Sequence, residues 1–376
     1  MIVGDVIVRG AGGGKPIKEW RENGLVTAAT GWGEIGSARI ADVFVTHDSN
    51  GSILSMKTSR GHTLRCSPEQ LCFCKFDPMS RLYYLYLMER STMGFRVGMS
   101  QDLLRDVFAL QSTKLVENDA SEIVDRIWII EGTESLPKAV FLARYASCKY
   151  GLPDVPFTGQ HATAELPDEL LRELFNRIDT PSRAHQLLLD SLMFEEYPHI
   201  TVKLNKNAPT ASNAVQFIVF GAAEKAGNCP GYAHLIRIDS AIELNRGEHK
   251  AFKRRMNNRG LWHLEVAREE FEEAQLFVKT LAALDNLEII KKIQLTKKAP
   301  FYILPASHVK LGMTVSVAGG RSIEEDTVTS ITVESWDNPL YDLKTEGIHN
   351  YIAGDWVVMS YSGQISTAPS LKRDVV

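Results

Sequence analysis

The pattern of apolar residues changes twice along the chain, and this layout constrains the fold more than any other feature. Residues 1–77 have the pattern of short strands separated by turns, and strand patterns return between 301 and 360. Between them, residues 78–300 mix strand patterns with helical ones, such as the helix expected after Pro167-Asp168. A single β domain interrupted by an insert explains this order, although two separate β domains would give a similar pattern. We expect residues 361–376 to form a polar tail.

Composition narrows the class of protein. The chain has 376 residues, of which 44% are hydrophobic and 23% charged, as in soluble globular proteins of two or three domains. No apolar run approaches the roughly 20 residues that span a bilayer, so we expect no contact with a membrane. The first residues reach Asp5 without the basic region of a signal peptide. Five cysteines, an odd number, argue against a secreted disulfide framework, and we expect a cytoplasmic protein.

Two local patterns lead to expectations about structure. Cys72 and Cys74 form a CxC pair with Cys66 close upstream, but no second Cys/His cluster follows at metal spacing. We therefore favour buried strand thiols over a zinc site, and expect no metal and no cofactor. The step Asn50-Gly51 lies between two strand patterns and predicts a hairpin that joins 43–45 to 53–56.

Three segments, in the same order as in the family, resemble the conserved blocks of inteins. Residues 341–354 (YDLKTEGIHNYIAG) are similar to the C-terminal block, residues 4–8 with 15–17 to the first block, and residues 58–70 (TSRGHTLRCSPEQ) to the second. The resemblance implies a mostly β HINT horseshoe, of the intein and hedgehog type, interrupted by an α/β insert. Its N-terminal half would be 1–77, its insert 78–300 and its C-terminal half 301–360.

The insert carries resemblances of its own. Residues 83–90, 94–98, 125–128 and 149–153 resemble inserts in inteins of bacterial UvrD/PcrA-type DNA helicases, which implies flanking host segments, in cis, that belong to a helicase. Residues 84–103 also resemble the opening hairpin of a GIY-YIG homing endonuclease. Tyr86 matches its first tyrosine, but Arg96 stands at the second, Asp106 (beside Arg105) at the arginine and Ala143 near the glutamate. Without that metal-binding carboxylate, we do not expect phosphodiester hydrolysis.

Protein splicing in the family that this chain resembles is autocatalytic and needs particular residue types. A Cys or Ser at position 1 attacks the preceding carbonyl, because a thiolate or hydroxyl is the nucleophile. A Thr and a His of the second block activate that peptide bond, the imidazole acting as a general acid. A nucleophile downstream of the intein captures the acyl group. The terminal Asn then cyclises with the help of the His before it and the His of the last-but-one block.

Most of these positions are substituted here. Met1 has no nucleophilic proton, and Ser67 and Gln70 stand where the second block has Thr and His. Glutamine is no acid, and Ser67 is most simply a turn hydroxyl before Pro68. At the last block, the His, the Asn and the nucleophile are replaced by the residues Met359, Ser360 and Tyr361. Moving the alignment with the family's last block by one residue would place Ser360 at the nucleophile, but no Asn would then stand at the terminal position. We therefore expect an intein-type self-processing domain that has lost splicing.

His349 is the splicing residue that is retained, with either a remnant catalytic role or that of a turn histidine satisfied by backbone. The resemblance also makes a geometric prediction. Ordinary termini fray at the surface, but both splice junctions must meet for acyl transfer to be intramolecular. Met1 should therefore be largely buried and in contact with the Ser67–Gln70 turn and the Met359–Ser360 strand end.

A basic stretch suggests an alternative function. Residues 246–259 hold six cations against Glu248: Arg246, Lys250, Lys253, Arg254, Arg255 and Arg259. This stretch is either a contact to duplex DNA or the solvated face of a helix, and the acidic run at 265–273 could neutralise part of it. The alternative function is a DNA-binding or degenerate homing-endonuclease module carried on a HINT scaffold.

Overall fold

The computed structural model divides the chain into two compact units. It describes residues 1–46, 51–76, 80–101, 124–157, 166–201, 204–205, 208–212, 214–227, 231–240, 253–256, 262–285 and 287–360. Met1–Phe76, Asn213–Val309 and Met313–Val376 form the first unit, here called the β unit. Asp77–Ser212 and Lys310–Gly312 form the second, here called the α/β unit. The basic residues Arg246, Lys250 and Arg259 and the tail at 361–376 lie outside the described residues.

Strands from the two ends of the chain build the larger part of the β unit. The N-terminal strands are β1 (Ile2–Val3), β2 (Ile7–Gly10), β3 (Gly13–Pro16), β4 (Leu25–Gly31), β5 (Glu34–Thr46), β6 (Ser52–Thr58), β7 (Thr63–Cys66) and β8 (Leu71–Lys75). The C-terminal strands are β20 (Phe301–Pro305), β21 (Thr314–Gly319), β22 (Ser322–Ser335), β23 (Leu340–Thr345), β24 (Asn350–Ala353) and β25 (Trp356–Met359). The mostly β character expected of the chain is confirmed.

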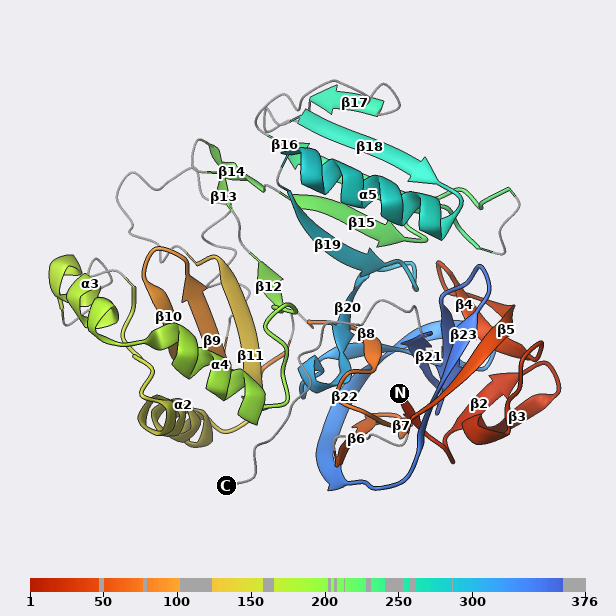
Figure 1. Cartoon of the computed structure of the whole chain (residues 1–376), viewed down its shortest axis with the longest axis horizontal. Coiled ribbons are helices and arrows are strands. Elements are labelled where there is room, and N and C mark those ends of the chain that lie inside the picture. Colours follow the sequence, from red (N-terminus) through yellow and green to blue (C-terminus); the bar gives the residue numbers. More distant parts are fainter. Residues whose placement is uncertain are drawn as a thin grey trace. The chain divides into compact units, whose positions relative to one another are not determined.

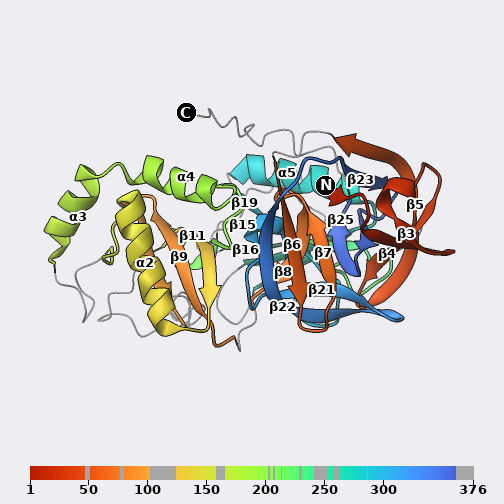
Figure 2. The same ribbon diagram turned by 90° about the horizontal axis from the view of Figure 1, so that it is seen from below.

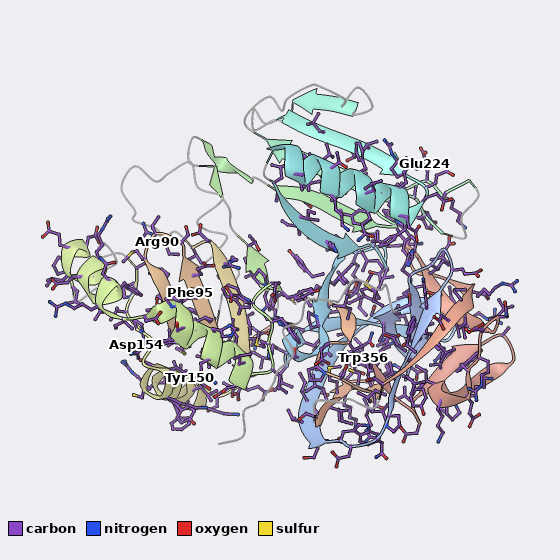
Figure 3. All side chains as sticks on the ribbon, viewed as in Figure 1. Arg90, Phe95, Tyr150, Asp154, Glu224 and Trp356 are labelled. Atoms are coloured by element: carbon purple, nitrogen blue, oxygen red, sulfur yellow. The ribbon has the colours of Figure 1, made fainter. Side chains whose placement is uncertain are left out.

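The two sets of strands interlock in antiparallel pairs. Strand β23 pairs with β1 and β5, β24 with β2, and β22 with β6. Strand β8 pairs with β20, β21 and β25. In Figures 1 and 2, red N-terminal strands and blue C-terminal strands accordingly lie among one another. The N- and C-terminal segments therefore build one β unit, and Trp356 is buried in its interior (Figure 3).

The hairpin predicted at Asn50-Gly51 is wrong. Residues 47–50 lie outside the described part, but the strands on either side pair elsewhere: β5 with β4 and β23, and β6 with β7 and β22. Local turn chemistry favoured the hairpin. Long-range partners with matching apolar faces take both strands instead.

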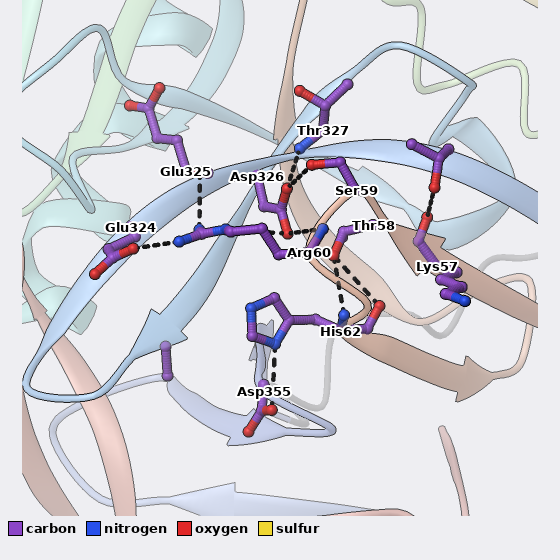
Figure 4. A network of polar contacts seen from close by, with 12 residues as sticks. Lys57, Thr58, Ser59, Arg60, His62, Glu324, Glu325, Asp326, Thr327 and Asp355 are labelled. Atoms are coloured by element: carbon purple, nitrogen blue, oxygen red, sulfur yellow. Dashed lines mark hydrogen bonds and ion pairs between the residues drawn. The ribbon is translucent and has the colours of Figure 1, made fainter.

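A tight turn places the last described residues. Gly354 and Asp355, between β24 and β25, have φ angles of 54° and 69°, as a two-residue hairpin of primed type requires. The Asp355 carboxylate accepts two hydrogen bonds from Arg9, at 2.9 and 2.7 Å, and lies 3.3 Å from His62 Nδ1. Figure 4 shows His62 and Asp355 beside a second cluster in which Arg60 pairs with Glu324 and Asp326. The contacts of Asp355 with Arg9 and His62 fix the β24–β25 hairpin to the N-terminal strands.

Residues 213–293 belong to the β unit rather than to one continuous insert. They form β15 (Ala214–Val219), β16 (His234–Ser240), β17 (Lys253–Met256), β18 (Trp262–Arg268), α5 (Phe271–Asp285) and β19 (Glu288–Ile293). Strand β15 pairs parallel with β19, and the other edge of β19 pairs with β20. This last pairing joins the segment to the terminal strands, so the expected insert 78–300 is divided between the two units. Helix α5 crosses the strands of this segment in Figure 1.

The α/β unit has its own sheet and core. Its antiparallel sheet has the order β10 (Gly94–Ser100), β9 (Tyr83–Arg90), β11 (Arg126–Thr133), β12 (Ile200–Thr201), and its helices are α2 (Leu136–Tyr150), α3 (Asp168–Arg177) and α4 (Thr180–Asp190). A small hairpin, β13 (Leu204–Asn205) and β14 (Ala208–Ser212), follows. Helices α2 and α4 bury Ala143, Ala146, Leu187 and Leu188 against Trp128 and the neighbouring strands. No helix in the described part of the chain is long and apolar enough to cross a membrane.

His234 lies in the aromatic core beneath α5. Its side chain is buried, and its ring contacts Phe217, Phe220 and Phe271. The Phe220 backbone N–H donates a hydrogen bond of 3.2 Å to Nδ1. Burial, and to a smaller extent the nearby His349, lower the pKa of His234 to about 4. The imidazole is therefore neutral in the folded protein.

This pKa predicts that the free energy of unfolding falls as the pH is lowered from about 6.5 to about 4. In that window the unfolded chain binds a proton at His234 and the folded chain does not. The full effect is roughly 3 kcal/mol. In His234→Asn, Oδ1 can still accept from Phe220 but does not titrate, so this contribution should vanish. Urea unfolding at several pH values measures both slopes, and equal slopes in the two proteins would contradict the assignment.

Candidate functional site

Strand β1 holds the first residue inside the β unit. Ile2 pairs with Tyr341 on one side and with Cys66 on the other, and both Ile2 and Val3 are buried. The Met1 side chain is partly buried against a cluster that contains Val3, Ile53 and Leu340. Met1 is thus fixed in place, although it is more exposed than the sequence analysis expects.

The turn between β7 and β8 contacts Met1 directly. The Ser67 N–H donates to the Met1 carbonyl at 2.9 Å, and the Met1 amino group donates to Ser67 Oγ at 3.1 Å. Backbone bonds anchor the turn from behind, since Ala306 N–H donates to Gln70 O at 2.7 Å and Ser307 N–H to Pro68 O at 3.1 Å. Ser67 and Gln70 are almost fully buried. The turn is therefore held in place by backbone hydrogen bonds, and its Ser67 and Gln70 side chains contact Met1.

Gln70 links the beginning of the β unit to the end of β25. Its Oε1 accepts from the Met1 amino group at 2.8 Å, while its Nε2 donates to the Met359 carbonyl at 2.9 Å and to the Leu71 carbonyl at 3.2 Å. A primary amide carries a donor and an acceptor at once, so one side chain can satisfy both segments. The structure thus brings together Met1, Ser67, Gln70 and Met359, four of the predicted site residues.

Ser360 and His349 stand next to this group, at the open end of the β24–β25 pair. Asn350 is paired with Met359, which makes His349 and Ser360 the next opposite residues, and Ser360 N–H donates to His349 O at 3.1 Å. Opposite residues of an antiparallel pair direct their side chains to the same face. Ser360 is 3% exposed, and its hydroxyl has no hydrogen-bond partner among the described residues.

Helix α5 supplies the surroundings of the His349 imidazole. The ring lies 4.1 Å from the Phe271 ring, centroid to centroid, and Nε2 is 3.3 Å from Glu272 Oε1. Burial lowers the pKa of His349, Glu272 acts to raise it, and Lys344 acts to lower it. Because the burial effect is the largest, the ring is neutral near pH 7 and able to accept a proton. A turn histidine whose side chain is satisfied only by backbone groups would not have these side-chain contacts with α5.

Asn350 has a structural role despite forming a His-Asn pair with His349. Its Oδ1 accepts from Ala29 N–H at 2.7 Å, and its Nδ2 donates to Ala29 O at 2.9 Å. The side chain therefore replaces a neighbouring strand at this point of β4. One residue further on, the Tyr351 hydroxyl donates to Asp342 at 2.9 Å in the same buried region.

The three cysteines of the CxC region are buried on β7 and β8, on either side of the turn formed by residues 67–70, here called the site turn. A hydrogen bond with the Cys66 thiol, followed by burial, raises the pKa of Cys72, and burial raises the pKa of Cys74 to about 12. These two thiols are protonated at neutral pH, and a protonated thiol is a poor nucleophile and metal ligand. Within the described residues, no three His, Cys, Asp or Glu side chains are arranged to hold a metal.

The nuclease-like residues of the α/β unit belong to its interior. Tyr86 and Arg96 are both buried, and Arg96 Nη2 donates to the Tyr86 hydroxyl at 3.3 Å. Ala143 is buried on α2, and Arg105 and Asp106 lie outside the described residues. Tyr86 therefore packs as a core aromatic, and the endonuclease hypothesis gains no support.

The basic stretch is described only at its centre. Residues 253–256, which include Lys253, Arg254 and Arg255, form β17 rather than a helix, and Lys253 lies opposite Glu265 in the register. The alternative of a solvated helix face is therefore wrong for these residues, which form a strand. DNA binding by this stretch stays a prediction.

Two residues near the site were not predicted from sequence. Glu272 contacts His349 from a helix that begins 78 positions earlier than His349, and no local pattern links the two. His308 is fully buried in the short 3-10 helix Ala306–His308, whose backbone anchors the site turn. In the sequence it stands in a segment with no recognisable motif.

Comparisons with known proteins find matches among solved structures. No protein-family model matches the chain, and no curated protein matches it. Among solved structures, the chain is similar to a mutant of an Ssp DnaB mini-intein variant, at 10% sequence identity and a TM-score of 0.26. The match covers 96% of this chain and 98% of that one. A TM-score this low does not establish a shared fold.

The structural role of Asn350 can be tested by its removal. Asn350→Ala leaves the Ala29 N–H and C=O buried without their partner, so the free energy of unfolding should fall by about 2–4 kcal/mol. Urea unfolding measures the change. Ser330→Ala, at an exposed position of β22, is the control and should change stability by less than about 0.5 kcal/mol. A loss below about 1 kcal/mol in Asn350→Ala would show that Asn350 is not a structural strand mimic.

Proposed function

We propose that the chain is an intein-type self-processing domain with a HINT fold that has lost protein splicing. The observation that carries this proposal is Gln70, which contacts both the Met1 nitrogen and the Met359 carbonyl. A segment of host protein preceding residue 1 would be attached at the first group, and one following residue 360 would begin beside the second. An ordinary binding domain has no reason to bring these two backbone positions together, whereas intramolecular acyl transfer requires it.

The side chains at these positions explain why splicing is lost. The Met1 thioether packs against apolar residues and has no proton to lose. Gln70 forms hydrogen bonds where the family has an imidazole, but an amide does not protonate a departing nitrogen. Ser360 stands at the place of the terminal Asn and has no side-chain amide to cyclise. The scaffold is retained, while the groups that transfer protons and acyl chains are replaced.

The proposal further holds that the partners are host segments attached in cis. We further propose that the host is a helicase, because the sequence of the insert resembles inserts in helicase inteins. Binding of duplex DNA has no supporting contact among the described residues and is not proposed as a second function.

Restoring the family residues provides the test. The chain is placed between two reporter domains and changed at five positions: Met1→Cys, Gln70→His, Met359→His, Ser360→Asn and Tyr361→Cys. Because the backbone positions already meet, this variant should release residues 1–360 as a free domain and ligate the reporters. The unaltered chain should give no ligated product. Gel electrophoresis and intact-mass spectrometry identify the products.

Two partial variants are the matched controls. Met1→Cys alone should give no ligation, since Gln70 still fails to activate the first peptide bond and Ser360 cannot cyclise. The five-fold variant without Met1→Cys should also fail to ligate, although it can cleave at its C-terminal junction. The proposal is wrong if the five-fold variant has the circular dichroism and thermal stability of the unaltered chain but neither ligates nor cleaves.

A further inference from the structure

We propose that the unaltered chain cleaves its own Met359–Ser360 peptide bond through an acyl shift onto Ser360 Oγ. This inference rests on the proposed function only in placing the reaction at the same site. It adds an activity that does not require Cys at position 1 or Asn at position 360. Three groups support it: a buried hydroxyl, a polarised carbonyl and a neutral imidazole on adjacent strands.

The nucleophile is the Ser360 hydroxyl. The residue is 3% exposed, and Oγ has no hydrogen-bond partner among the described residues. A buried hydroxyl without a partner costs free energy, so such a position needs an explanation. Here Oγ is attached one residue after the Met359 carbonyl carbon, and attack on that carbon closes a five-membered ring. Such an intramolecular attack avoids the entropy cost of bringing two reactants together.

The carbonyl that would be attacked is already hydrogen-bonded by the site turn. Gln70 Nε2 donates to the Met359 oxygen at 2.9 Å. Gln70 is 3% exposed, and its turn is anchored by the Ala306 and Ser307 backbone, so the donor is fixed before reaction. A fixed donor in a buried site stabilises the oxyanion that forms on this oxygen. Gln70, which cannot act as an acid, is well suited to this different role.

His349 is the group that can carry the proton. It lies opposite Ser360 on the neighbouring strand, with its side chain on the same face. The Glu272 carboxylate, 3.3 Å from Nε2, and the tilted Phe271 ring, 4.1 Å away between centroids, restrict the orientation of its ring. Because burial lowers its pKa, the ring is neutral near pH 7 and can take a proton from Oγ. Glu272 then acts as a positioning residue for the imidazole.

The reaction is balanced without a cofactor or co-reactant other than water. Oγ bonds to the Met359 carbonyl carbon as its proton passes to His349, and the tetrahedral oxyanion is held by Gln70. Collapse breaks the bond between that carbon and the Ser360 nitrogen, which receives the proton from His349 and becomes an amine. The product is an ester between Met359 and Ser360. Water then hydrolyses the ester to the Met359 carboxylate and the free Ser360 hydroxyl.

Mass spectrometry of the purified full chain tests the proposal. Incubation at neutral pH should slowly release a peptide that begins at Ser360 and leave a domain that ends at Met359. Hydroxylamine should increase the yield and leave a hydroxamic acid on Met359, which identifies the ester. Ser360→Ala should abolish the reaction, and Gln70→Leu should slow it at least about 10-fold. Ser360→Cys should make the cleavage sensitive to added thiol, because the intermediate becomes a thioester.

Ser316→Ala is the matched control. Ser316 is also fully buried, with a hydroxyl that has no partner among the described residues, but it belongs to β21 and does not follow the Met359 carbonyl in the chain. This variant should cleave like the unaltered chain. Equal cleavage in Ser360→Ala, or no hydroxylamine-dependent product from a chain with a native thermal transition, would overturn the proposal. If the five-fold variant ligates while the unaltered chain does not cleave, this inference alone fails. If the unaltered chain cleaves while the natively folded five-fold variant neither ligates nor cleaves, the proposed function alone fails.

Discussion

The pairing of β1 on both of its edges is the constraint on which the site depends. This strand has two residues, yet it pairs with β23 through Ile2 and Val3 and with β7 through Ile2. Burial of each apolar side chain contributes about 1.5–3 kcal/mol, which offsets the entropy lost when the first residues are ordered. An unpaired terminus would fray, and the Met1 nitrogen would not remain beside Gln70. The contacts of Gln70 with Met1 and Met359 therefore depend on the pairing of β1.

Gln70 joins the two ends of the β unit through a side chain that does not exchange protons. An imidazole and a primary amide both reach two hydrogen-bond partners at once, but the amide does not exchange a proton near pH 7. Gln70 therefore links Met1 to Met359 and supplies no acid beside the first residue. The same amide nitrogen points at a carbonyl that precedes a serine. We propose that Gln70 both prevents splicing and stabilises the oxyanion of the acyl shift onto Ser360.

Much of this arrangement follows from the sequence because it depends on local pattern and block order. The strand patterns of both ends, the helices α3 and α4, and the meeting of Met1 with Gln70 and Met359 could all be predicted. The actual pairing of the strands on either side of Asn50-Gly51 could not, because it depends on partners more than 260 residues away, such as Ser335 opposite Ser52. The assignment of residues 213–293 to the β unit was missed for the same reason, since it depends on the pairing of β19 with β20.

The contact between α5 and His349 makes residues 213–293 more than an attached segment. Phe271 lies against the imidazole and the Glu272 carboxylate is 3.3 Å from its Nε2, so the helix influences both the burial and the charge environment of the ring. Burial is the larger influence and lowers the pKa, while Glu272 opposes it. Loss of the segment would remove both effects, and the pKa of His349 would rise toward its ordinary value. The basicity of the site is therefore set by residues that the intein-like blocks do not contain, which is why those blocks alone could not reveal it.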